Sequence, residues 1–357
     1  MQVHGRQRTG VGEALAAAAL FGLSTPLAKL LLVAVSPQVL AGLLYLGSGI
    51  GLTLFWLSRR ARAAPSREAR LTRRDIPWLA GAIIAGGVVA PVLLLAGLAA
   101  TPASTASLLL NLEGVFTALI AWIVFRENVD RRIFLGMGAI VAGGVLLSWA
   151  GGVLLGGIQG PLLVVAACLG WALDNNLTQK VSGSDPVEVA GLKGLVAGAV
   201  NLGLGLTFHG ALPEVSRLVG ALLLGFMGYG VSLVLFVLGM RHLGTARTGA
   251  YFSLAPFVGA VTGLVLFGEA VTLPLLLAAL LMGLGLWLHL TERHEHDHVH
   301  QPMRHAHQHL HDQHHQHQHQ HGSGDPPGEP HAHVHFHPRL VHRHPHYPDI
   351  QHRHTHD

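Results

Sequence analysis

The sequence contains a single cysteine and few charged side chains, and both shortages narrow the class of protein. Cys168 has no second cysteine to pair with, which excludes an intrachain disulfide. Asp, Glu, Lys and Arg make up 12% of the 357 residues, about half of their usual share in a soluble domain. The sequence also lacks a phosphate-binding loop, a dinucleotide fingerprint and a recognisable Ser/His/Asp arrangement, so it does not indicate an enzyme.

Long apolar stretches take up most of residues 11–290. Each stretch is long enough to cross about 30 Å of hydrocarbon as a helix at about 1.5 Å per residue. The sequence therefore predicts an all-α membrane protein with ten transmembrane helices in the lipid bilayer. The stretches cover residues 11–35, 37–58, 75–99, 102–125, 131–150, 158–179, 186–208, 215–240, 244–267 and 272–290.

Positive charges alternate along the chain. Of the 23 Lys and Arg residues, 20 fall in one alternating set of links between the apolar stretches, which includes both termini and the link at 59–74. Only Arg217 falls in the other set, whereas Lys29 and Lys193 lie inside apolar stretches. Because cytoplasmic links are rich in Lys and Arg, we expect both termini to be cytoplasmic. The Ala, Gly, Leu and Arg bias is typical of a GC-rich bacterium, so the expected location is the bacterial inner membrane.

The two halves of the chain resemble each other. PQVLAGLLYLGSG at 37–49 aligns with PVEVAGLKGLVAG at 186–198. Phe125–Glu127 likewise matches Phe267–Glu269, and we expect Glu127 and Glu269 to have a structural role where the fourth stretch of each half ends. Since each half holds five stretches, an odd number, the second copy is predicted to enter the membrane inverted. The expected domains are a cytoplasmic N-terminus at 1–10, a first five-helix repeat at 11–150, a second at 158–290 and a tail at 291–357.

Proline and glycine positions indicate where the helices bend or approach one another. Pro26, Pro91 and Pro256 lie inside apolar stretches, and they predict kinks or broken helices there because proline frees a backbone carbonyl. Three glycine pairs have the spacing that lets membrane helices pack closely. These pairs are Gly47 with Gly51, Gly194 with Gly198, and Gly259 with Gly263.

With this duplication, the chain resembles the bacterial drug/metabolite transporter superfamily, with two EamA-type repeats of five helices. Besides the two Phe-x-Glu motifs, the resemblance rests on FGLSTP at 21–26 in the first stretch and WALDNN at 171–176 in the sixth. It covers about residues 11–290. It implies a secondary transporter that exports or exchanges a small metabolite or drug by alternating access, and it leaves the substrate open.

Glu113 is the sharpest candidate for a functional side chain. It lies about 11 residues into its stretch, near the centre of the bilayer. Ionisable groups are costly in hydrocarbon, so we expect Glu113 to bind substrate or a coupling proton. The alternative is a structural carboxyl that stays protonated and is hydrogen-bonded to a neighbour.

A second group of candidates follows in the sixth and seventh stretches. Asp174, Asn175 and Asn176 are consecutive and point around most of a helix, so they cannot all face lipid. They indicate a cavity or a locally unwound turn, or else a structural network between helices. Lys193 lies about 7 residues into its stretch and either snorkels to the cytoplasmic interface or lines the same site.

Lys29 lies near the outer end of the first helix, where it can reach the interface. Together, two acids and two bases inside the stretches balance each other, which suits buried charges that are paired or share protons. Further candidates for lining the site are Asn111, Tyr229 and Tyr251.

The composition changes abruptly after Leu290. Residues 291–357 hold 23 of the 27 histidines, mostly in His-x-His alternation. This predicts a disordered cytoplasmic tail with two arms, 294–321 and 331–356. Neutral imidazoles suit Zn, Ni, Co or Cu. The candidate metal ligands are His294, His296, His298, His300, His305, His307, His309, His311, His331, His333, His335 and His337.

Two functions remain open on the sequence alone. The first is a small-molecule transporter, with protons as a candidate coupling ion, whose tail is a metal-binding appendage. The second is a protein that exports or buffers a transition metal. The tail could also be a pH-responsive polycation or a repeat expansion without a role. No cofactor is required in either case, no nucleic-acid partner is expected, and the choice between a monomer and a homodimer stays open.

Overall fold

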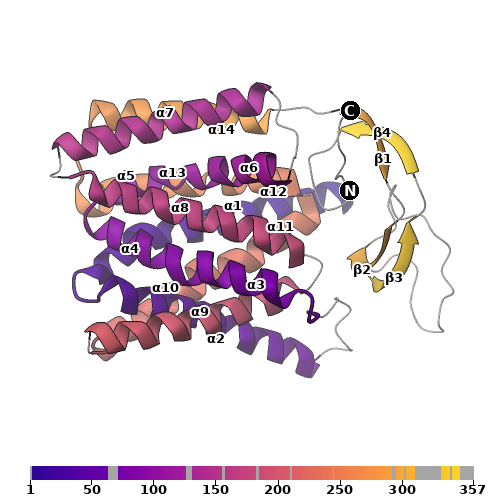
Figure 1. The fold of residues 1–357 in the computed structure, drawn as a ribbon, viewed down its shortest axis with the longest axis horizontal. Helices are drawn as coiled ribbons and strands as arrows, with labels where there is room; N and C mark the ends of the chain where they lie inside the picture. Colours follow the sequence, from indigo (N-terminus) through magenta and orange to yellow (C-terminus); the bar gives the residue numbers. More distant parts are fainter. Residues whose placement is uncertain are drawn as a thin grey trace.

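Most of the chain forms one bundle of helices that run along a common direction (Figure 1). The structure is a computed structural model, and it describes most residues up to Thr291 and four segments of the tail. The described residues are 2–62, 71–125, 131–154, 157–181, 185–209, 211–243, 245–291, 295–300, 303–309, 331–337 and 340–345.

The helices divide into two series that match the expected halves. The first series consists of α1 (Gln2–Leu32), α2 (Pro37–Arg62), α3 (Ile76–Ala82), η1 (Ile83–Val89), α4 (Ala90–Ala99), α5 (Ala103–Leu109), α6 (Leu112–Phe125) and α7 (Arg131–Leu154). The second consists of α8 (Gln159–Thr178), η2 (Gln179–Val181), α9 (Pro186–His209), α10 (Val215–Gly225), η3 (Phe226–Val231), α11 (Ser232–Leu243), α12 (Thr245–Phe252), α13 (Ala255–Phe267) and α14 (Leu273–Leu290).

Within the described residues, 7 helical segments are long and apolar enough to cross a membrane. Two further apolar helices, Ala255–Phe267 and Leu273–Leu288, are shorter. α8 is 20 residues long but ends in a polar segment, so its apolar part is shorter too. The segments that meet the criterion are Thr9–Leu32, Pro37–Arg59, Ile76–Ala99, Ala103–Val124, Arg131–Trp149, Val187–Phe208 and Val215–Gly239.

The proline prediction is confirmed at Pro256. At Pro91 the chain stays helical, and Pro91 lies in the first turn of α4, directly after the π-helical segment η1. Pro256 lies in the first turn of α13, after a turn at 253–254 that separates it from α12. At Pro26 the helix is not broken, because α1 continues through it, and a kink there remains a prediction. In a membrane helix, the carbonyl that proline frees can be satisfied by a neighbouring helix or by a Ser or Thr side chain.

The same irregularities occur in both halves. η1 and η3 are both π-helical, and η3 begins 143 residues after η1 begins. The chain also breaks between α5 and α6 at 110–111, and the break between α12 and α13 lies 143 residues further on. This spacing agrees with the sequence repeat.

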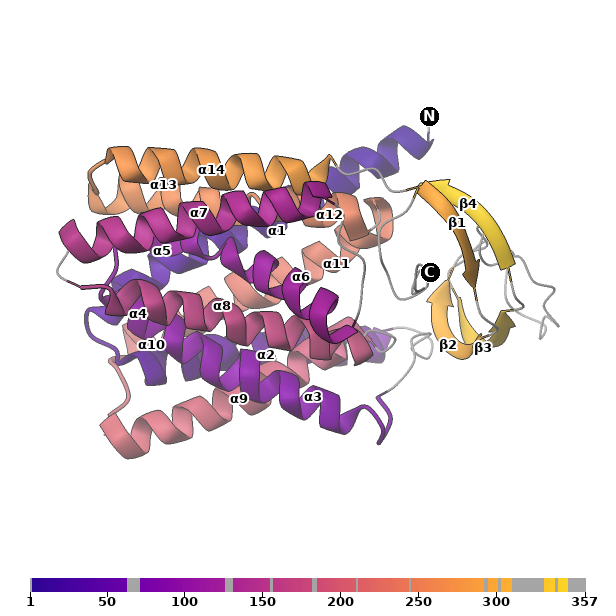
Figure 2. The ribbon, with the colours of Figure 1, turned by 45° about the horizontal axis from the view of Figure 1, so that its top comes forward.

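Close glycine packing joins the two halves along α2 and α9. A Cβ added at Gly49 would lie 2.4 Å from the backbone nitrogen of Leu195, and one at Gly198 would lie 2.5 Å from that of Leu46. Residues with higher numbers on α2 therefore contact residues with lower numbers on α9. The two helices are antiparallel neighbours (Figures 1 and 2). The other two glycine pairs also meet neighbouring helices at such distances, which confirms the prediction of close approach.

Four segments of the tail are extended strands. β1 (Glu295–His300) pairs antiparallel with β4 (Leu340–Pro345), and β2 (Met303–His309) pairs antiparallel with β3 (His331–His337). The prediction of a disordered tail is therefore wrong over these four segments. Its His-x-His alternation has a period of two residues, which matches a strand. The strands lie beyond the end of the bundle at which α1 begins (Figure 1).

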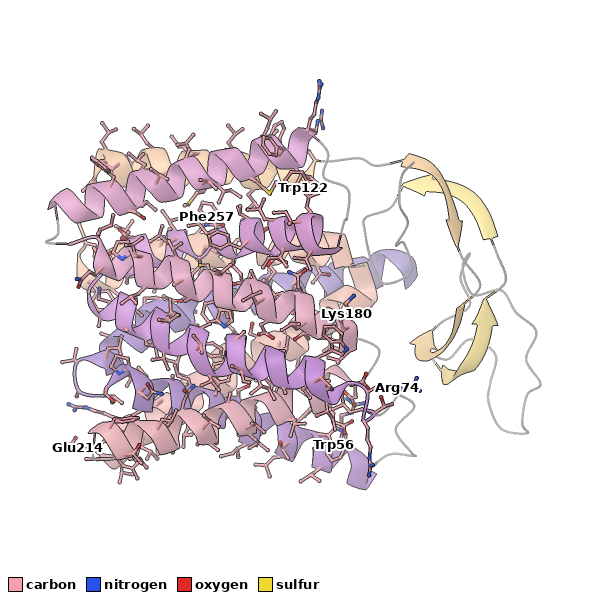
Figure 3. All side chains as sticks on the ribbon, in the orientation of Figure 1. Trp56, Arg74, Trp122, Lys180, Glu214 and Phe257 are labelled. Atoms are coloured by element: carbon pink, nitrogen blue, oxygen red, sulfur yellow. The ribbon has the colours of Figure 1, made fainter. Side chains whose placement is uncertain are left out.

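The two ends of the bundle differ in charge. Figure 3 places Arg74 and Lys180 at the end that faces the strands and Glu214 at the opposite end. The charge pattern predicts that the links with Arg74 and Lys180 lie on the same side of the membrane, and both residues lie at one end of the bundle. We call the end with Arg74 and Lys180 the basic end, and the other the distal end.

Candidate functional site

Glu113 lies at a break in the middle of its span. The chain leaves helical geometry after Leu109, and the backbone N–H of Asn111 donates to the carbonyl of Leu108 at 3.1 Å. The Asn111 side chain donates to the same carbonyl at 2.9 Å, which competes with the helical hydrogen bonds. α6 then begins anew, with Glu113 in its first turn, where the helix dipole favours a carboxylate.

The carboxyl of Glu113 faces α8. The Asn175 amide donates to Glu113 Oε1 at 2.8 Å and lies 3.4 Å from the hydroxyl of Thr117. Glu113 is half-buried and Asn175 is exposed. The contact joins a half-helix of the first repeat to a helix of the second. The two candidates Glu113 and Asn175 therefore lie at the interface between the halves.

Asp174 and Lys193 form an ion pair between α8 and α9. Asp174 is 4% exposed and also accepts a hydrogen bond from the Thr178 hydroxyl at 2.9 Å. Lys193 therefore does not extend to the interface, and its alternative as a snorkelling residue is wrong. Since Lys193 pairs with Asp174, Glu113 is the acid of this group whose hydrogen-bond donor in the described residues is an uncharged amide.

The unwound turn expected at 174–176 is not present, because α8 is helical throughout this segment. Asn176 points inward instead and is 5% exposed. Its amide donates to the carbonyl of Ala172 at 2.8 Å and to that of Thr117 at 3.2 Å. It connects α8 to α6 structurally, whereas its neighbour Asn175 remains accessible.

The π-helical segment η1 packs directly against the ion pair. A Cβ added at Gly86 would lie 2.0 Å from Asp174 Oδ2, so only glycine leaves room for this carboxylate. The carbonyl of Gly86 accepts hydrogen bonds from Tyr45 Oη at 2.8 Å and from Trp171 Nε1 at 2.9 Å. A π-helical turn frees such carbonyls from their usual helical partners.

The neighbouring carbonyl of Gly87 accepts a hydrogen bond from the Asn201 amide at 3.1 Å. Asn201 is fully buried. Side chains of α2, α8 and α9 thus converge on η1. Sequence reasoning did not assign a role to Tyr45, Trp171 or Asn201 in this contact, because nothing in the residue pattern marks a π-helical segment.

The remaining candidates lie around this group or apart from it. Tyr229 in η3 packs against the rings of Tyr45 and Phe21, with centroid distances of 5.7 and 5.8 Å. Asn111 is buried and bonds within its own break and to Met282. Tyr251 lies on α12, apart from the contacts described above for Glu113.

Lys29 does not join the group around Glu113. Its ammonium donates to the carbonyl of Thr101 at the distal end and lies 5.8 Å from the centroid of the Phe267 ring. Glu269 is an acid that acts on it electrostatically. Of the four charges expected to be paired or to share protons, Asp174 and Lys193 pair with each other, and Lys29 lies apart from Glu113.

The tail histidines are described through their backbone alone. His294 and His311 lie outside the described residues. Among the described side chains, no group of three or more His, Cys, Asp or Glu is placed to hold a metal ion. The other ten candidate histidines occupy positions in β1, β2 and β3.

These features define a class of protein. Apolar spans, half-helices that end inside the bundle and a polar site shared by two related halves are typical of membrane transporters. The chain belongs to the EamA-like transporter family, whose pattern matches residues 8–149 and 158–291. It is therefore a multi-pass membrane protein and a transporter of small substrates, with one EamA repeat in each half, as the resemblance predicted.

Several known proteins are similar to this chain. An uncharacterized transporter of Methanothermobacter thermautotrophicus is 31% identical over 284 residues, which cover 74% of this chain and 81% of the relative. A probable 4-amino-4-deoxy-L-arabinose-phosphoundecaprenol flippase subunit ArnE of Klebsiella pneumoniae is 36% identical over 91 residues, which cover 26% of this chain and 80% of the relative. One crystal structure covers 78% of this chain and 95% of its own at a TM-score of 0.57 and 20% identity, which shows a shared fold.

Proposed function

We propose that this protein is a secondary transporter of the bacterial inner membrane that exports or exchanges a small metabolite or drug by alternating access. Ten spans in two inverted halves would carry the movement. One observation supports this most: Glu113, on a half-helix of the first repeat, is held by Asn175 of the second. Transporters with inverted repeats bind substrate where broken helices of the two halves meet.

The chemistry of the site follows from its charges. Asp174 is neutralised by Lys193, so this pair fixes α8 against α9 and does not need a ligand. Among the described residues, the neutral amide of Asn175 is the hydrogen-bond donor to the carboxyl of Glu113. This carboxyl can therefore exchange that amide for a proton or for a polar group of the substrate as the halves move. A coupling proton on Glu113 would link transport to the proton gradient.

The proposal is tested with Glu113→Gln, which keeps the shape of the side chain but cannot take up and release a proton. Proteoliposomes containing a pH-sensitive dye are challenged with amino acids, polyamines and quaternary ammonium compounds in turn. We expect solute-dependent proton movement in the wild type and a loss of at least about tenfold in the variant. Glu214→Gln, at the distal end on the N-terminal side of α10, is the control and should keep the wild-type rate. Equal rates in both variants would assign Glu113 a purely structural role.

We further propose that the tail binds transition-metal ions. The register of the strands supports this, because it places His305 opposite His335 and His307 opposite His333. Directly opposed residues have Cβ atoms about 5 Å apart, a spacing at which two imidazoles can share one metal. Export of the metal through the bundle has less support, since the described spans contain no group of His, Cys, Asp or Glu suited to a metal.

A further inference from the structure

Glu269 connects the end of one repeat to the start of a half-helix in the other. α13 ends at Phe267, and the positive φ of 60° at the next residue, Gly268, turns the chain away from the helix. The carboxylate then accepts hydrogen bonds from the backbone N–H of Ala103 at 2.6 Å and of Ser104 at 3.0 Å. The hydroxyl of Ser104 donates to it as well. The free N–H groups at the start of α5 are thereby capped by a residue of the second repeat.

Lys29 strengthens the same junction from a third helix. Its ammonium donates to the carbonyl of Thr101, two residues before α5 begins, and lies over the ring of Phe267, the last residue of α13. α1, α5 and α13 are therefore joined at the distal end by one acid and one base. Charged hydrogen bonds of this type are stronger than neutral ones.

Next to this junction, α5 and α13 pack closely against each other. A Cβ added at Gly263 would lie 2.7 Å from the backbone nitrogen of Ser104, and one at Gly259 would lie 2.7 Å from Ser107 Oγ. Ser107 itself is 1% exposed. α5 and α13 are thus in close contact at Ser104 and at Ser107, between the distal end and the break that precedes Glu113.

We propose that Glu269, assisted by Lys29, is a latch that closes the distal side of the transporter. Opening to that side requires the carboxylate to leave the start of α5. α5 spans Ala103–Leu109, about 10 Å at 1.5 Å per residue, and leads directly to the break before Glu113. Release of the latch would therefore free the short helix that positions the substrate site. This inference rests on the proposed alternating access.

A labelling experiment measures the latch without requiring transport. Ser107→Cys is introduced into the full chain with Cys168→Ala, and an impermeant thiol reagent is added at the distal side. We expect the intact latch to protect the cysteine. Glu269→Gln should raise the labelling rate about tenfold, as for the loss of a hydrogen bond to a charged group, and Glu214→Gln should leave it unchanged. Equal labelling rates with and without Glu269→Gln would overturn the latch.

A second experiment keeps Glu269 in place, so it also applies if the substituted protein does not fold. Ala103→Cys and Ala270→Cys are joined by a short reducible cross-linker in proteoliposomes. Cross-linking should abolish transport, and reduction should restore it. Full transport in the cross-linked protein would show that the junction does not open. Absence of transport before cross-linking would instead contradict the proposed function, and the labelling result would still decide the latch.

Discussion

At the scale of single residues, the two acids of the site differ in their partners and in their burial. Buried Asp174 pairs with half-buried Lys193, and Gly86 leaves room for the carboxylate. Glu113 has an uncharged partner and remains half-buried. A carboxylate that is fully paired holds helices in place, whereas one that is bound by an amide can change partners. This difference is why we assign binding to Glu113 and positioning to Asp174.

The ion pair predicts a specific pattern of stability. Lys193→Met removes the countercharge and leaves Asp174 buried without one, which should lower the free energy of unfolding by about 3 kcal/mol. The double variant Lys193→Met, Asp174→Asn should be clearly more stable than Lys193→Met alone, because it no longer buries a charge. Thermal unfolding of the purified protein in detergent measures both. A double variant that is less stable than the single one would contradict the assignment of a simple neutralising pair.

At the scale of helices and strands, much of the fold could be predicted from the sequence, and the failures have physical causes. Apolar length predicted the seven described segments that are long enough to cross a membrane, and Pro256 indicated where a helix starts anew. The break before Glu113 has no proline or glycine at 110–111, so it could not be predicted from those signals. The π-helical segments depend on hydrogen bonds from distant helices. In the tail two signals conflict, because the composition predicts disorder whereas the His-x-His alternation has the period of a strand.

The anchoring of η1 predicts a non-additive pair of substitutions. Tyr45 and Trp171 both donate to the carbonyl of Gly86, so either donor still satisfies it when the other is lost. Tyr45→Phe should therefore cost about 1 kcal/mol or less. Adding Trp171→Phe leaves the carbonyl without these donors, and the double variant should lose more stability than the sum of the two single variants. A double-mutant cycle by thermal unfolding measures the difference, and strict additivity would show that the two donors act independently.

At the scale of the whole molecule, the charge pattern and the fold agree. Links rich in Lys and Arg lie at one end of the bundle, where Figure 3 shows Arg74 and Lys180. The orientation in the membrane follows only if this end is cytoplasmic. A cysteine at position 66 should then be protected from an impermeant reagent in cells with a permeabilised outer membrane, whereas Leu212→Cys should react. Both are made with Cys168→Ala. The reverse labelling pattern would invert the topology and place the latch of Glu269 on the cytoplasmic side.

The tail is joined to the bundle after α14, and its role can be separated from transport. Removing residues 294–357 should leave solute transport unchanged, because the site and the latch lie in residues 29–269. The same deletion should remove most zinc binding by the full-length protein, measured by competition with a chromophoric chelator. Binding should also fall steeply below about pH 6, where protonated imidazoles cannot ligate.

The strand register sharpens this test into a comparison of two equal sets of substitutions. Alanine at His305, His307, His333 and His335 removes residues that β2 and β3 place opposite each other. Alanine at His314, His315, His317 and His319 removes the same number from the segment between the strands. If opposed histidines share metal ions, the first set should lower zinc affinity much more than the second. Equal losses would mean that the number of imidazoles alone determines binding, and that the pairing of the two arms has no part in it.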